Sequence, residues 1–173
     1  MKKVILVIAG LLVLGLIAIQ FVPVERTNPP VTAPLEADAK VLAMLRESCF
    51  DCHSNETVWP WYSYVAPMSW LVTKDVSEGR EHFNFSEWGD YSAGDQAHIA
   101  EEAVEETEEG KMPLPAYLRL HPEAKLTPED KALLEGWSRE VEAAGHSGSD
   151  GEGDEAGEET ESDGGHQHDH DHD

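Results

Sequence analysis

The sequence has few cysteines, and this shortage narrows what the chain can be. Its 173 residues include only two, Cys49 and Cys52, separated by two residues. A small secreted domain held by disulfides uses several widely spaced pairs, and a bridge across so short a loop restrains little of the unfolded chain. We therefore interpret these two thiols as chemical rather than structural.

Basic residues are also scarce, with 12 Lys and Arg against 35 Asp and Glu and a formal net charge of −23. A nucleic-acid-binding surface needs cations to neutralise phosphates, so we expect no nucleic-acid partner. The period-2 alternation typical of strands is missing as well, and helical spacing recurs in its place. The sequence therefore predicts an all-α fold.

One long hydrophobic run opens the chain. Residues 4–22 carry no charge, and as a helix they span about 28 Å, which nearly matches a bilayer core. Lys2 and Lys3 precede the run, and the positive-inside rule places them in the cytoplasm. No A-x-A-like cleavage site follows, so we expect residues 1–24 to be an uncleaved membrane anchor with the domain on the periplasmic, extracytoplasmic side. A cleaved signal peptide is the alternative, and it exports the domain equally.

Composition divides the rest of the chain. Residues 23–35 hold four prolines, and residues 25–35 are expected to form an extended tether. Residues 36–144 form the predicted domain. Its last helix is expected to start with Thr127 as N-cap and Pro128 in the first turn, and to end at Gly145. The preceding helices are expected at about 36–47, 68–80 and 94–109.

Residues 145–173 have 11 acidic residues and no Lys or Arg, a composition that predicts a disordered tail. The tail ends in four histidines interleaved with aspartates: His166, His168, His170 and His172. Imidazoles beside carboxylates suit a divalent metal such as Zn, Cu or Ni, which makes the tail a candidate metal site. The competing interpretation is a solvated charged segment that binds nothing in particular.

The two cysteines belong to the motif Cys49-Phe50-Asp51-Cys52-His53, the C-x-x-C-H pattern of c-type haem attachment. Thiols one helical turn apart can both add to vinyl groups on one porphyrin edge. The next residue then presents its imidazole to the iron. The motif predicts one covalent haem c held by Cys49 and Cys52, with His53 as an axial ligand of the metal.

Three other interpretations of the motif remain open at this point. A thioredoxin-like redox pair needs a βαβ context, which the sequence does not show. A zinc site needs a second Cys/His pair, and adjacent Cys and His rarely ligate one tetrahedral ion together. A plain disulfide is compatible with an oxidising compartment.

The motifs C-x-x-C-H, W-P-W-Y, N-F-S-E-W and M-P follow one another between residues 36 and 140. In this order they resemble the bacterial haem-binding-domain family of small cytochrome c-like proteins. The resemblance implies a cytochrome c-like α-helical fold around a single haem. It does not imply a reaction, because members are defined mostly by haem binding.

A low-spin electron carrier needs a sixth iron ligand, and Met112 is the first choice for it. Met112 lies 59 residues after His53, in a Pro-rich loop before the last helix, and the M-P motif of the resembled family supports the same position. The competing role for Met112 is that of a buried gap-filler. The other candidate ligands are Met68, His82, His98 and His121. The remaining possibility is that the sixth position is open.

Other residues are candidates to surround the haem. The aromatic residues after the motif are expected either to wall it or to pack the core: Trp59, Trp61, Tyr62 and Trp70. Arg80 and Arg119 are candidates to pair with its propionates.

The function that these observations favour is one-electron transfer by a membrane-anchored carrier, with redox partner proteins of unknown identity. We expect no enzymatic activity, because haem peroxidases of the covalent type generally carry two haem motifs and this chain has one. Two rival functions are a haem enzyme or small-ligand sensor with an open sixth site, and metal handling by the histidine-rich tail.

Overall fold

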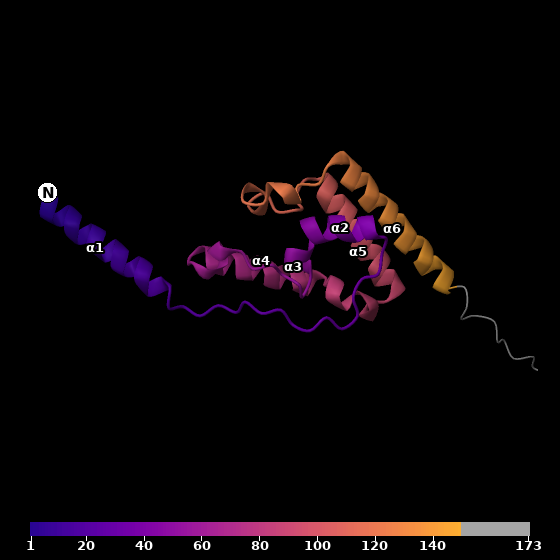
Figure 1. Cartoon of the computed structure of the whole chain (residues 1–173), viewed down its shortest axis with the longest axis horizontal. Coiled ribbons are helices and arrows are strands. Elements are labelled where there is room, and N and C mark those ends of the chain that lie inside the picture. The colour runs from indigo at the N-terminus through magenta and orange to yellow at the C-terminus, as the bar shows by residue number, and fades with distance from the viewer. Residues whose placement is uncertain (150–173) are drawn as a thin grey trace, which may run out of the picture.

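Helices make up all of the regular structure in the part of the chain that the computed structural model describes, residues 1–149 (Figure 1). The α-helices of this part are α1 (Lys2–Ile19), α2 (Ala39–Ser48), α3 (Phe50–His53), α4 (Met68–His82), α5 (Ala93–Glu108) and α6 (Pro128–Ser149). Its short 3-10 helices are η1 (Trp61–Tyr64), η2 (Phe85–Asp90), η3 (Tyr117–Arg119) and η4 (Pro122–Ala124). The all-α prediction is confirmed for these residues.

The core of the domain is rich in aromatic rings. Helices α5 and α6 pack along each other, and α2 contacts α6. Phe85 of η2 is fully buried at the centre, where its ring stacks on Phe50 at 5.0 Å and meets Trp137 of α6 at 6.3 Å. A fully buried Phe contributes roughly 1.5–3 kcal/mol. These rings therefore tie η2, α3 and α6 into one unit.

The start of α6 matches the predicted cap, but its end does not. Thr127 Oγ1 accepts a hydrogen bond from Asp130 N at 3.2 Å, and the Asp130 carboxylate accepts one from Thr127 N at 2.9 Å, a reciprocal cap. The expectation that Gly145 ends the helix is wrong, because α6 continues to Ser149. A Cβ on Gly145 would lie 3.3 Å from Ala93 O, so this glycine permits close packing on the start of α5.

The predicted acidic tail lies mostly outside the described residues. Residues 145–149 belong to α6, so the first part of the predicted tail is helical. Residues 150–173, with the four histidines near the end, are outside the described part, and the expectations of disorder and of metal binding there stay predictions.

Residues 25–35 are extended, as expected, but they are bound to the domain. Ala33 N donates a hydrogen bond to Ser86 O at 3.0 Å, and Leu35 N donates one to Phe85 O at 2.8 Å. Leu35 is buried in the aromatic core. We call residues 25–35 the strap, because backbone hydrogen bonds hold this segment along η2.

Helix α1 extends away from the other helices (Figure 1), and none of its residues is buried. Its 18 residues are long and apolar enough to cross a membrane, a property that signal sequences near an N-terminus share. The helix ends three residues before the predicted limit at Val22, in a turn whose amide groups bond to carbonyls of the last helical turn.

Candidate functional site

The predicted motif forms a single helical turn. Cys49 caps α3, and its carbonyl accepts hydrogen bonds from Cys52 N at 3.2 Å and from His53 N at 3.0 Å. Phe50 points the other way, into the aromatic core. Ser54 Oγ donates to Phe50 O at 2.7 Å as the turn ends. One side of the turn is therefore packed in the core through Phe50. The opposite side carries the two thiols and the imidazole.

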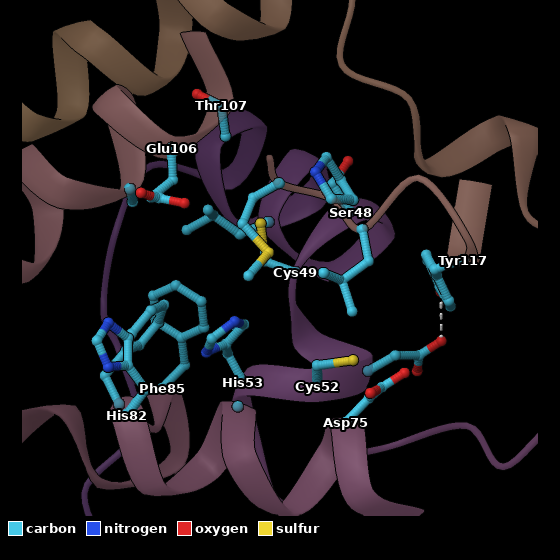
Figure 2. A pocket seen from close by; sticks show the side chains of 18 of the residues that line it. Ser48, Cys49, Cys52, His53, Asp75, His82, Phe85, Glu106, Thr107 and Tyr117 are labelled. Atoms are coloured by element: carbon cyan, nitrogen blue, oxygen red, sulfur yellow. Dashed lines mark hydrogen bonds between the residues drawn. The ribbon is translucent and has the colours of Figure 1, made fainter. Parts of the chain in front are cut away.

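These side chains face a cavity of about 500 Å³. Figure 2 shows Cys49, Cys52 and His53 at its edge, with Glu106 and Thr107 of α5 across from His53. The cavity also reaches the loop after α5, where Met112 is part of the lining. The three motif residues and Met112, which lies 59 residues after His53, therefore line the same cavity.

His53 is buried and neutral. Its ring lies flat against Phe83, with centroids 4.0 Å apart and planes 12° from parallel. Burial lowers the pKa of His53 to about 4, against a smaller opposing effect of the backbone at Phe83 and Gly79. Neither backbone group is placed to bond to its Nδ1, which is buried without a hydrogen-bond partner. A neutral imidazole is the form that binds a metal, so this ring is ready to act as a ligand.

The thiols are free and protonated. Burial, and secondarily the nearby Cys52, raises the pKa of Cys49 to about 12, and burial, Asp51 and Asp75 raise that of Cys52 to about 12. Activated redox cysteines have a lowered pKa, which disfavours the thioredoxin-like interpretation. Within residues 1–149, no three His, Cys, Asp or Glu side chains are grouped to hold a metal ion.

The structure separates the candidates for the sixth ligand. Met112 and His82 line the same cavity as His53, whereas Met68 lines a smaller neighbouring cavity of about 50 Å³. His98 is exposed on α5 and is not part of either lining. His121 is engaged elsewhere, with its Nε2 2.6 Å from the Tyr62 hydroxyl. Of the two that reach the cavity, His82 has a partner in Glu102 at 3.2 Å.

The walls of the cavity come from residues that the sequence did not single out. Phe83, Phe85 and Tyr117 line it, whereas Trp59, Trp61, Tyr62 and Trp70 do not. Phe85 belongs to the N-F-S-E-W motif and Phe83 directly precedes it, so the resemblance carried a signal for this pair. No sequence signal pointed to Tyr117, because its role depends on contact with Asp51 of α3.

Tyr117 holds the outer side of the motif. Its hydroxyl donates a hydrogen bond to Asp51 Oδ2 at 2.8 Å, the dashed line in Figure 2. The other carboxylate oxygen of Asp51 accepts one from Val58 N at 2.9 Å. Burial, together with the bond to Asp51, raises the pKa of Tyr117. The hydroxyl therefore stays protonated and keeps the loop after α5 on the α3 turn.

Arg80, a candidate partner for propionates, instead forms hydrogen bonds with other segments of the chain. Neither Arg80 nor Arg119 lines the cavity. The Arg80 guanidinium crosses from α4 to the strap and to the segment after α3. It donates hydrogen bonds at 2.7–3.0 Å to the carbonyls of Ser54 and Thr27 and to the side-chain oxygens of Asn28 and Thr57.

Helix α4 approaches the motif very closely at Gly79. A Cβ built on this residue would lie 2.7 Å from Cys52 O and 3.1 Å from Cys52 Cβ. Only a residue without a side chain fits at this contact. Gly79 therefore sets the distance between α3 and α4, and with it the place of Cys52 at the cavity.

A comparison with known families agrees with this geometry. The family described as haem-binding domain matches residues 14–140, well over half of the chain. The match covers the end of α1, the strap and nearly the whole helical domain. No curated protein and no solved structure matches the chain significantly.

Proposed function

The chain belongs to the haem-binding domain family, and from this membership we propose that it holds one covalent c-type haem and serves as a membrane-anchored one-electron carrier. One observation carries the proposal. The two thiols and the imidazole of a single C-x-x-C-H turn face a 500 Å³ cavity that Met112 also lines. Neither the thioredoxin-like nor the zinc interpretation accounts for a cavity of that size.

The cavity fits the group that the motif implies. Its volume lies within the roughly 300–1,000 Å³ typical of cofactor sites, and most of its lining is apolar, including Leu45, Phe83 and Leu134. Cys49 and Cys52 would form the thioethers, His53 would ligate the iron, and Met112 would take the sixth position. When bound, the haem supplies an iron centre that cycles between two oxidation states, with a potential set by its ligands and surroundings.

The chain's own residues prepare the site for this role. Phe83 holds the His53 ring in one orientation, and burial keeps the ring unprotonated. Tyr117 and the Val58 amide fix Asp51, and thus the turn that carries both thiols. These contacts hold the His53 ring and the turn with both thiols in place. We therefore propose electron transfer without enzymatic bond-making, and an open sixth site in an enzyme or sensor is the rival.

Replacing Met112 separates the carrier from its rival. In Met112→Ala the oxidised protein is expected to lose completely the weak near-infrared band of sulfur-to-iron coordination. The potential falls and the reduced iron binds carbon monoxide, because a thioether ligand raises the potential and blocks the site. Absorption spectra with and without carbon monoxide, and a redox titration, measure these effects.

Two variants serve as controls for the ligand. Met68→Ala should leave the spectrum unchanged, since Met68 lines only the neighbouring small cavity. His82→Ala should also leave it unchanged. If His82→Ala opens the site while Met112→Ala is silent, the ligand is His82. If the native protein already binds carbon monoxide, the open-site rival replaces the carrier.

The cavity lining suggests what kind of redox partner suits the domain. It includes five carboxylates and no Lys or Arg: Asp51, Asp75, Glu78, Glu102 and Glu106. We propose that the partner presents a basic surface, since opposite charges accelerate encounter and salt screens the attraction.

Small redox reagents test this charge effect on the haem protein. Electron exchange with a cationic reagent should slow by about 10-fold as salt rises from about 0.01 M to about 0.5 M. Glu78→Gln with Glu102→Gln should weaken this salt dependence, whereas Glu140→Gln, exposed on α6 outside the cavity lining, should not. An anionic reagent that reacts as fast at low salt would contradict the proposal.

We also propose that α1 is the membrane anchor and that the domain lies on the extracytoplasmic side. The length and apolar composition of α1 support the anchor. Lys2 and Lys3 before the run support the side, by the positive-inside rule. Covalent haem attachment outside the cytoplasm is consistent with the same arrangement.

A further inference from the structure

The segment from Val58 to Leu71 exposes many large apolar side chains. Trp61 is 78% exposed, Val58 75% and Tyr64 60%. The full set of exposed large apolar residues in this segment is Val58, Trp61, Tyr64, Val65, Met68, Trp70 and Leu71. Exposed apolar side chains that gather in one place mark an interaction site, and here they gather in one segment of 14 residues. We call this set the 58–71 surface.

Hydrogen bonds place the 58–71 surface at the end of the anchor helix. The Gln20 side chain, just after α1, donates from Nε2 to Ala66 O at 3.1 Å and accepts from Ala66 N at 2.9 Å. Arg26 donates to Ser63 O at 3.1 Å, and its guanidinium lies 4.5 Å from the Tyr64 ring centre. The surface therefore begins where α1 ends.

The charge pattern distinguishes this segment from the rest of the chain. Residues 57–73 contain no Asp, Glu, Lys or Arg, although the chain has 35 acidic residues. The acidic residues in other parts of the chain would be repelled by anionic lipid headgroups. Residues 57–73 would not be, because they contain no Asp or Glu. Trp and Tyr are the residues that favour the interface between headgroups and acyl chains.

We propose that the 58–71 surface lies in the headgroup region of the membrane that α1 crosses. This inference rests on the proposed anchor, because Gln20 then sits where the helix leaves the bilayer. The rings of Trp61 and Tyr64 enter the interface, and Arg26 meets the phosphates.

The 58–71 surface lies next to the cavity proposed for the haem, without lining it. Met68 and Leu71 line the small cavity together with Cys52 and Tyr117, which also line the larger one. Contact with lipid on the outer side of these residues therefore fixes the haem cavity in a defined orientation close to the membrane.

Photo-crosslinking to lipid tests the proposal on the full-length haem protein. The protein is reconstituted in phosphatidylcholine–phosphatidylglycerol vesicles whose acyl chains carry a diazirine near the headgroup, and the labelled peptides are identified by mass spectrometry. Peptides from α1 and from residues 58–71 should carry lipid, whereas peptides from α5 should not. Labelling of α1 alone overturns the inference and leaves the anchor standing. Absence of label from both overturns both.

Matched variants identify the side chains that contact the lipid. Trp61→Ser with Val65→Ser should reduce labelling of the 58–71 peptides several-fold, leave α1 labelling unchanged and leave the haem spectrum intact. Val31→Ser, at another exposed apolar residue, should change neither. If the 58–71 peptides instead crosslink to a second copy of the chain, the surface is a dimer interface and the proposal is wrong.

Discussion

A chain carrying Cys49→Ala and Cys52→Ala is expected to lose all haem that survives denaturation. Two thioether bonds are the only covalent links that the motif offers, because the described part of the chain contains no other cysteine. His53 can still ligate iron in the folded protein, but coordination does not withstand unfolding. Haem staining of a denaturing gel, compared with staining for protein, measures the loss.

Single variants and a neighbouring control sharpen this result. Cys49→Ala and Cys52→Ala alone should each retain a shifted reduced spectrum at lower yield, because one thioether remains. Ser48→Ala, adjacent to the motif and also in the cavity lining, should keep full staining. Covalent haem in the double variant would falsify the assignment of Cys49 and Cys52 as the haem attachment sites.

Adding a single methyl group at Gly79 is expected to have the second largest effect. In Gly79→Ala the new carbon would sit 2.7 Å from the Cys52 carbonyl oxygen. Backbone cannot rotate away as a flexible side chain can, so α4 must shift from α3. Overpacking of this kind costs about 1–3 kcal/mol, and the displaced Cys52 should lower the yield of covalent haem.

Gly136 on α6 provides the matched control. A Cβ there meets nothing within 4 Å, so Gly136→Ala should gain about 0.8–1 kcal/mol from helix propensity alone. Denaturant unfolding and the haem-to-protein ratio are measured for both variants. A Gly79→Ala protein as stable as Gly136→Ala, with full haem content, would show that the α3–α4 contact yields easily.

Local signals in the sequence located the helices and the motif turn. Thr127 and Asp130 cap α6 through bonds that span three residues, and such near-neighbour chemistry is visible in one dimension. The same holds for Cys49 to His53, whose geometry follows from one turn of helix. These features were predictable because their partners are close in the chain.

The features that sequence reasoning missed depend on partners far along the chain. Tyr117 reaches Asp51 across 66 residues, and Gly145 serves contact with Ala93 rather than a helix end. Arg80 looked like a propionate partner, but it binds backbone of the strap and the segment after α3. Composition alone cannot distinguish an extended segment that is bound from one that is free, since the hydrogen bonds that hold it leave no local pattern.

The strap limits how far the domain can travel. A free linker of 19 residues between α1 and α2 would have an end-to-end distance of roughly 22–26 Å, and the domain could move over that range. Backbone bonds from Ala33 and Leu35 to η2, with Arg80 bonded to Thr27, leave almost no slack. If the domain carries electrons as proposed, it therefore stays at one place on the membrane, and its rate of electron transfer depends on how often mobile partners diffuse to it.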